Sequence, residues 1–132
     1  TVIQDVEIPI EKAGIFFSFF IQHIGILPIW ICPIKPHNPN RKYPLYLLDP
    51  KKLYINFGFW DTVSSPGPGI KNRMIEKKVL ELGGMKSLYS ESFFSPEEFW
   101  KTYNSRVYMH VKKKYDPEGK FKDLYEKTVK RR

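Results

Sequence analysis

The chain has 132 residues, 42% apolar and 16% aromatic, a composition that supports one folded domain with a core and excludes an intrinsically disordered chain. Its 22 lysines and arginines against 14 acidic residues give a net charge of +8, which suits either an anionic partner or an ordinary solvated basic surface. The single cysteine, Cys32, excludes an internal disulfide, and the three histidines are too scattered to predict a metal site.

The first part of the chain predicts two strands and one helix. Alternation over Thr1–Ile8 predicts a strand that Pro9 ends, and Glu11–Ile24 predicts a helix with a broad apolar surface. We expect that helix to be buried on more than one side, between the sheet and a neighbouring domain. An interfacial membrane contact and a membrane span are less favoured alternatives, because polar residues and Pro28 interrupt the apolar run. The second predicted strand is Pro28–Ile34.

The middle of the chain predicts a long loop and the clearest strand. Lys35–Lys52 contains four prolines and is therefore expected to be an excursion without regular structure. Leu53–Trp60 alternates strictly, so its two faces differ. One face is expected to join the core (Leu53, Ile55, Phe57, Phe59), and the other to line a site (Tyr54, Asn56, Gly58, Trp60).

The last part predicts a helix, a strand and a capped helix. Ile70–Leu82 is expected to be an amphipathic helix that the following glycines close, and Met85–Phe94 a strand. Ser95-Pro96-Glu97-Glu98 predicts a helix start, because Ser95 and Glu98 can cap each other's backbone groups. Asn104-Ser105 predicts a break in that helix, and Tyr115–Phe121 predicts a turn.

The order of these elements predicts an α+β fold of the ferredoxin-like βαββαβ type in a single domain over 1–132. We expect a four-stranded antiparallel sheet with both main helices on one face and extra helices at the C-terminus. The uncovered face would carry polar and aromatic groups at period-two spacing, a pattern typical of an interface or pocket.

Several motifs resemble the C-terminal domain of vanillyl-alcohol-oxidase-type FAD-linked oxidoreductases, in particular the delta-24 sterol reductase (Diminuto) branch. They come in family order and span nearly the whole chain: Val2-Ile3-Gln4-Asp5, Val6-Glu7-Ile8-Pro9, Pro28-Ile29-Trp30-Ile31-Cys32-Pro33, Leu53-Tyr54-Ile55-Asn56-Phe57-Gly58, Leu88-Tyr89-Ser90, Glu97-Glu98-Phe99-Trp100 and the turn Tyr115–Phe121.

This resemblance implies that the chain is a substrate-capping domain whose sheet covers FAD held by an N-terminal domain. No glycine-rich phosphate loop occurs in the chain, so the flavin would be bound mainly by that other domain. In the reductase branch NADPH is the expected electron donor and the substrate is an apolar olefin. The expected location is cytoplasmic, with peripheral membrane association as an alternative.

The resemblance also places the candidate site residues. Similar sugar-alcohol oxidases carry a His-Trp-x-Lys motif at the flavin edge, where this chain has Leu88-Tyr89-Ser90-Glu91. Because an acid replaces the lysine, alcohol oxidation is not expected, and Tyr89 and Glu91 become the candidates for the olefin-protonating pair. Glu91 as a solvated edge residue is an equal alternative. Tyr54, Asn56 and Trp60 are the candidate substrate-binding residues.

Two functions of other classes remain open. A βαββαβ sheet with exposed aromatics and a net charge of +8 is also the plan of an RNA-recognition module, although Leu53–Trp60 lacks the basic-Gly-aromatic opening of its motif. A flavin-free scaffold for protein contacts is the other alternative. The lysines at Lys112–Lys114 and Lys120 are interpreted as a solvated face in preference to a contact with the flavin domain.

Overall fold

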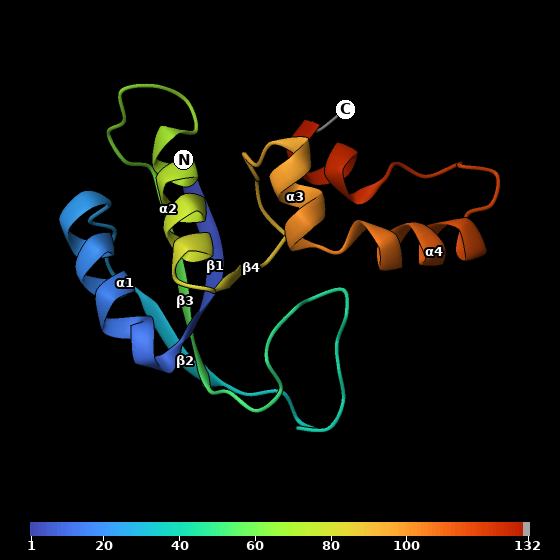
Figure 1. The fold of residues 1–132 in the computed structure, drawn as a ribbon. Coiled ribbons are helices and arrows are strands. Elements are labelled where there is room, and N and C mark those ends of the chain that lie inside the picture. Colours follow the sequence, from blue (N-terminus) through green and yellow to red (C-terminus); the bar gives the residue numbers. More distant parts are fainter. Residues whose placement is uncertain (131–132) are drawn as a thin grey trace.

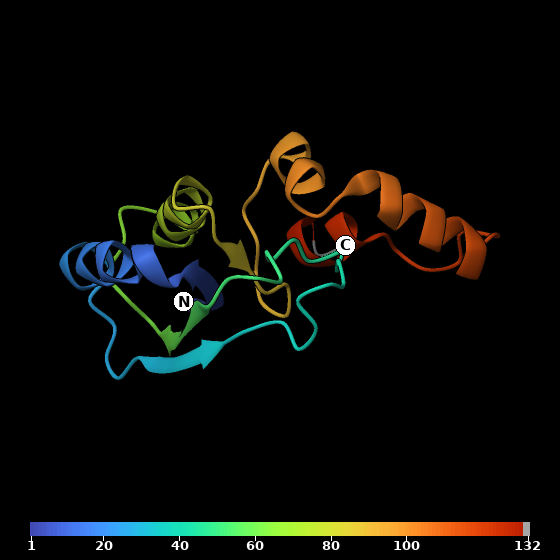
Figure 2. The same cartoon turned by 60° about the horizontal axis from the view of Figure 1, so that its bottom comes forward.

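The computed structural model describes residues 1–130, which form one four-stranded antiparallel sheet with helices. The strands lie in the order β2-β3-β1-β4: β1 (Val2–Pro9), β2 (Trp30–Ile34), β3 (Tyr54–Asp61) and β4 (Met85–Lys86). Helices α1 (Ile10–His23) and α2 (Ile70–Glu81) cover the same face of the sheet (Figure 1, Figure 2). The predicted α+β fold with both helices on one face is confirmed.

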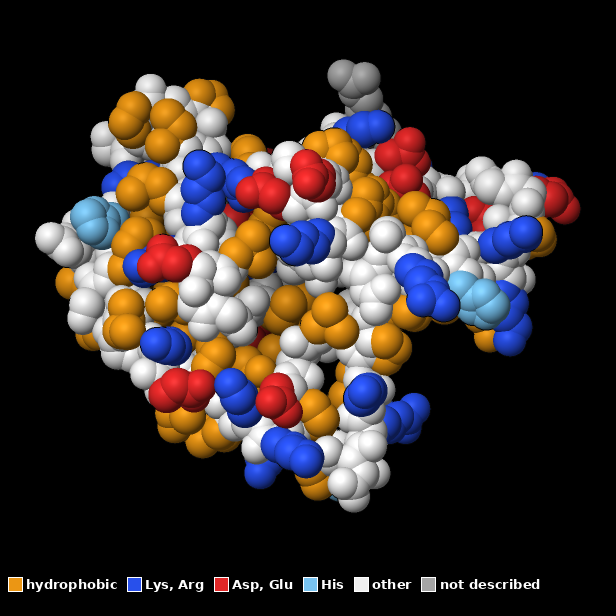
Figure 3. Space-filling model, in the orientation of Figure 1, with side chains coloured by type: hydrophobic (Ala, Val, Ile, Leu, Met, Phe, Trp, Pro, Cys, Tyr) orange, Lys and Arg blue, Asp and Glu red, His pale blue; other side chains and the backbone are white. Residues whose placement is uncertain are grey.

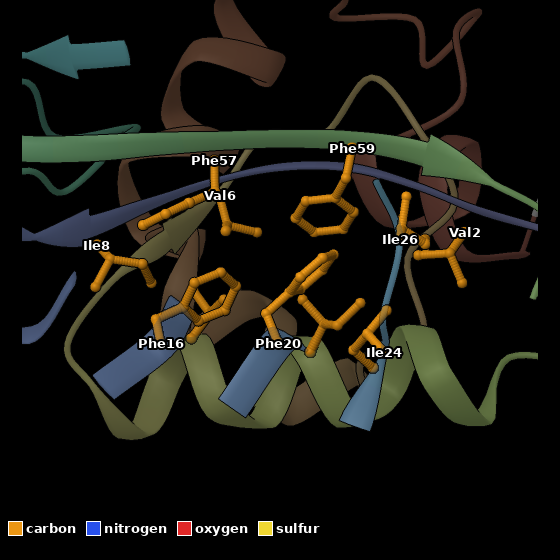
Figure 4. Packing of buried hydrophobic residues seen from close by; sticks show 11 residues of the cluster. Val2, Val6, Ile8, Phe16, Phe20, Ile24, Ile26, Phe57 and Phe59 are labelled. Carbon is orange, nitrogen blue, oxygen red and sulfur yellow. The ribbon is translucent and has the colours of Figure 1, made fainter. Parts of the chain in front are cut away.

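The main core lies between that face and the two helices. Phe57 and Phe59 of β3 point toward α1, where Phe16 packs on Phe57 with ring centroids 5.0 Å apart and Phe20 on Phe59 at 4.3 Å (Figure 4). Burial of large apolar side chains stabilises the folded state by about 1.5–3 kcal/mol each. The other members of this cluster are Val2, Val6, Ile8, Ile24, Ile26, Ile75 and Val79.

The opposite side of the sheet, called the open face below, carries the alternate residues of the same strands. Antiparallel register places Ile3 opposite Trp60, Asp5 opposite Gly58, and Glu7 opposite Asn56. Because opposite residues share a face, the two faces of each strand keep their predicted difference. The open face comprises Ile3, Asp5, Glu7, Trp30, Cys32, Tyr54, Asn56, Gly58 and Trp60.

Helix α1 is buried on the side that packs on the sheet and α2. Phe16 and Phe20 are fully buried, whereas Ile15, Phe17 and Ile21 are between 41% and 49% exposed. Burial of these exposed residues against a neighbouring domain stays a prediction. Within residues 1–130, no helix combines the length and apolarity that crossing a membrane requires.

The C-terminal helices α3 (Pro96–Thr102) and α4 (Ser105–Tyr115) lie beside the sheet, past its β4 edge (Figure 1). Both bonds of the predicted capping box are present, since Ser95 Oγ accepts the N–H of Glu98 at 3.2 Å and Glu98 Oε2 accepts that of Ser95 at 3.0 Å. The predicted break is also confirmed: Asn104 has a φ of 52° and separates α3 from α4. A π-helical turn, η1 (Glu126–Lys130), follows. The second core cluster consists of Met85, Phe94, Phe99, Tyr103 and Tyr125, and Val129 of η1 packs against it.

Lysine and arginine side chains gather along the α4 arm in Figure 3. Lys112 pairs with Asp116, and Lys120 with Glu118 at 2.6 Å, whereas Lys113 and Lys114 are exposed. Glu118 and Lys120 are each 69% exposed, and ion pairs of this kind contribute little to stability. These contacts favour the interpretation of this segment as a solvated basic face.

The prediction of a strand over Met85–Phe94 is wrong beyond Lys86, where β4 ends. The N–H of Ser87 still donates to the carbonyl of Asp5 at 3.0 Å, but later backbone groups bond to partners outside β1. The carbonyl of Glu91 accepts from Lys86 Nζ, and the N–H of Phe93 donates to Glu76 Oε1 at 2.9 Å. Because these bonds give the Glu91 carbonyl and the Phe93 N–H hydrogen-bond partners, the segment Ser87–Ser95 can be irregular without leaving these two groups unpaired.

Candidate functional site

A cavity of about 440 Å³ lies where the start of β1 meets the segment after β4. Tyr89 and Glu91, the two candidate catalytic residues, both line it. Their side chains come from the irregular segment that replaces the predicted strand, so they are not fixed by strand alternation. The remaining lining residues are Thr1, Ile3, Asn72 and Ser90.

Tyr89 reaches from this segment onto the open face. Its phenol lies near the Asp5 carboxyl of β1, and 63% of the residue is exposed. Loss of water around the phenol, followed by its interaction with the Asp5 carboxylate and the nearby charge of Glu7, raises the pKa of Tyr89 to about 12. At neutral pH the phenol therefore keeps its proton and remains a donor.

Glu91 and Ser90 form the part of the cavity wall next to Tyr89. Glu91 is half-buried, and its backbone carbonyl is held by the ammonium group of Lys86. The hydroxyl oxygen of Ser90 is buried and has no hydrogen-bond partner within residues 1–130. A buried polar atom in that state is a natural partner for a ligand or a water molecule.

The three candidate substrate-binding residues of β3 lie at different places. Trp60 is 60% exposed on the open face opposite Ile3, a cavity residue, so it lies at the cavity's end of the face. Asn56 lies further along the strand and donates to Glu7 Oε1 at 3.0 Å. Tyr54 is buried, with its hydroxyl accepting the N–H of Asp49 at 2.9 Å. The structure thus brings Tyr89, Glu91 and Trp60 to one end, and places Asn56 and Tyr54 toward the other.

Sequence reasoning missed a buried carboxyl group on the open face. Glu7 is only 5% exposed and is hydrogen-bonded to Tyr46 of the long excursion, to Asn56, and to Ser87 at 3.3 Å. Desolvation raises its pKa, and the three hydrogen bonds offset part of that rise. The signal available in the sequence was strand alternation, which puts Glu7 on the same face as Ile3 and Asp5.

Sequence reasoning also missed how Asp5 lies on this face. Gly58, opposite Asp5, has no side chain, and the Asp5 carboxyl occupies the space that a Cβ would fill. Trp30 of β2 is also opposite Gly58 and is 61% exposed. Trp30, Gly58 and Asp5 therefore form a row across the sheet, with Trp60 and Ile3 in the next row.

Comparisons with known proteins agree with the motif-based resemblance. The chain is 28% identical over 137 residues to the Delta(24)-sterol reductases of Rattus norvegicus and Homo sapiens, and 26% identical over 152 residues to that of Arabidopsis thaliana. These alignments cover 98% to 99% of the chain but 25% to 27% of the relatives. No protein-family model and no solved structure matches the chain.

The chain thus spans about a quarter of the length of the curated relatives it matches. Similarity along almost all of its own residues, to relatives with the same name from mammals and a plant, agrees with motifs that are spread from β1 to the turn after α4. The resemblance predicted from the motifs is confirmed: over nearly its whole length this chain is similar to the delta-24 sterol reductases, a branch of the FAD-linked oxidoreductases.

Proposed function

We propose that this chain is the substrate-capping domain of an FAD-dependent, sterol-reductase-like enzyme that reduces a double bond in an apolar substrate. The observation that carries the proposal is that Tyr89 and Glu91 line one cavity at the end of an open sheet face bearing exposed tryptophans. Concave sites with apolar walls and a few convergent polar groups are typical of small-molecule binding.

The residues of the open face suit the ring of FAD and do not suit its phosphates. Trp30 and Trp60 present large, exposed aromatic surfaces on adjacent strands, which would pack against a flat ring. Asp5 and Glu7 on the same face would repel phosphate groups. We therefore propose that the phosphates are held by an N-terminal FAD-binding domain, and that this chain covers only the ring side.

FAD, when bound, would supply the hydride that reduces the double bond, with NADPH as the proposed source of electrons. The part left to this chain is to orient the substrate and deliver a proton. Tyr89 keeps its proton at neutral pH, and its phenol lies beside the cavity near Asp5. Glu91 lines the same cavity and is the alternative donor or the group that orients Tyr89.

Apolar residues around this end of the open face support an apolar substrate. Ile3 is 43% exposed and Trp60 is 60% exposed, and they face each other across β1 and β3. A hydrocarbon substrate would remove both side chains from water, which contributes roughly 25 cal/mol for each Å² buried. The name of the relatives suggests a sterol with a Δ24 double bond as the first substrate to test.

The acidic residues of the open face argue against the RNA-binding alternative. RNA-recognition modules with a βαββαβ sheet stack bases on that sheet and attract phosphates with basic groups. Here Asp5 and Glu7 lie on the open face, and the cations of the α4 arm are elsewhere. A flavin-free scaffold for protein contacts would leave the Tyr89 cavity without a role.

The test is turnover by the longer protein that carries the proposed FAD-binding domain. The purified protein should contain flavin, and NADPH together with a Δ24 sterol should give the saturated product. The isolated chain is the matched control and should neither copurify with flavin nor form product. Flavin bound by the isolated chain, or a flavin-loaded long protein that leaves olefins unchanged, would contradict the proposal.

A further inference from the structure

We propose that the buried ion pair between Lys86 and Glu76 is a positioning device that fixes the segment carrying Tyr89 and Glu91 against the cavity. Lys86 Nζ lies 3.0 Å from Glu76 Oε1, and both side chains are fully buried. Lys86 comes from β4, Glu76 from α2, and neither residue lines the cavity. The catalytic consequence of this inference rests on the proposed function, whereas the positioning itself does not.

The side chain of Lys86 closes the loop that begins at its own backbone. Its ammonium group donates to the carbonyl of Glu91 and to Ser92 Oγ, the latter at 3.0 Å. The residues between these two attachment points include Tyr89 and Ser90. Three bonds to one ammonium group therefore tie the C-terminal end of this loop to β4 and α2.

Glu76 holds the next residue in the same way. Its Oε1 accepts the N–H of Phe93 at 2.9 Å, and the ring of Phe93 lies where a side chain on Gly69 would be. On the other end of the loop, the N–H of Ser87 donates to the carbonyl of Asp5 at 3.0 Å. The loop that carries Tyr89 is thus fixed at both ends.

A stabilising role alone explains this pair poorly. Taking two charges out of water costs several kcal/mol per ion, and their attraction often no more than offsets that cost. The pair instead positions the chain, because it forms hydrogen bonds with three consecutive residues, Glu91, Ser92 and Phe93. The first of them is a candidate catalytic residue, and the other two follow it directly. An apolar pair of similar volume would fill the space without directing any of them.

The test uses the environment of Tyr89 as its readout. A fluorinated tyrosine at position 89, whose phenol ionises at lower pH than tyrosine, is titrated by ¹⁹F NMR in the chain. The double variant Lys86→Met/Glu76→Gln removes both charges while keeping an acceptor for Phe93. The matched control is Lys78→Met/Glu81→Gln, which removes an ion pair of 2.7 Å on the partly exposed side of the same helix.

We expect the phenol pKa in the double variant to fall by about one unit toward its ordinary value, because the loop no longer holds Tyr89 against Asp5. The control should titrate like the parent. A folded double variant with the parent titration would overturn the proposal. Should the double variant not fold, Ser92→Ala removes one bond to Lys86, and amide exchange of Tyr89 and Glu91 should become about fivefold faster; unchanged exchange would also overturn it.

The same double variant in the longer protein separates the two proposals. Reduced turnover at saturating substrate, with the Tyr89 titration shifted, is expected. A shifted titration with parental turnover would leave the positioning role intact and contradict the assignment of Tyr89 to the reaction. An unshifted titration would contradict the positioning role whatever the turnover.

Discussion

The Asp5 carboxyl lies in the space that a Cβ atom would occupy on Gly58 of the neighbouring strand. The Trp30 Cβ is 3.3 Å from the same point, so the space over Gly58 is closed from both flanking strands. Glycine at this position therefore lets Asp5 lean across the sheet, with its carboxylate near the Tyr89 phenol. The absence of a side chain on β3 thus helps to place a group of the candidate site.

Gly58→Ala should displace the Asp5 carboxyl and weaken its interaction with the Tyr89 phenol. Because Asp5 is the end of a side chain that can move, the expected loss of stability is modest, about 1 kcal/mol or less. The pKa of Tyr89 should fall below its value of about 12. Gly14→Ala on α1 is the matched control: nothing lies within 4 Å of its added Cβ, so it should stabilise by about 0.5–1 kcal/mol and leave Tyr89 unchanged.

Glu7 should make the chain less stable as the pH rises. Its pKa in the folded state is raised above 4.5 by burial, so folding favours the protonated form. The stability that this group contributes is complete below pH 4.5 and is lost as the pH rises through the folded value. Urea unfolding between pH 4.5 and 7 should show a downward trend in the parent that Glu7→Gln reduces. An equal trend in both proteins would show that Glu7 is not the group responsible.

Glu98, at the start of α3, should make the chain less stable as the pH falls, which is the opposite trend to that of Glu7. Hydrogen bonds from Arg73 and from the backbone of Ser95 lower the pKa of Glu98 to about 2. The stability contributed by Glu98 is therefore present above pH 4.5 and is lost as the pH falls through about 2. Glu98→Gln should flatten this acid-side loss, measured by thermal unfolding between pH 5 and 2. A parental acid profile in the variant would contradict this role for Glu98.

The cap itself can be tested separately. Ser95→Ala removes the acceptor for the N–H of Glu98, and loss of such a cap costs about 1 kcal/mol. Ser64→Ala, at an exposed loop position, is the matched control and should change the unfolding free energy by less than 0.5 kcal/mol, roughly the usual limit for surface changes. Equal unfolding free energies for the two variants would contradict the energetic role of the cap.

Local sequence signals predicted the features that depend on neighbouring residues. The alternation of Leu53–Trp60 separated core from open face because strand geometry alone decides which way each side chain points. The capping box at Ser95 and Glu98 was predictable for the same reason, since both partners lie within one helical turn.

What the sequence did not predict depends on residues far apart in the chain. The segment after β4 is held by long-range bonds, because Lys86 and Glu76 of α2 bond the backbone of Glu91 and Phe93. Glu7 is buried because Tyr46, 39 residues further along, folds back onto it. Strand propensity and alternation contain no information on either contact, so the positions of Tyr89 and Glu91 within an irregular segment could not be predicted.

The most direct test of the account is the reoxidation of reduced flavin by a Δ24 sterol in the longer protein, compared between the parent and Glu91→Gln in a single turnover. Glu91→Gln keeps the shape of the side chain and removes its titratable proton, and Tyr89→Phe does the same for the phenol. We predict that flavin reoxidation slows by about 100-fold or more in whichever variant lacks the proton donor, Glu91→Gln or Tyr89→Phe. Flavin reduction by NADPH should change little in that variant. Parental rates in both variants would contradict the assignment of this cavity as the catalytic site.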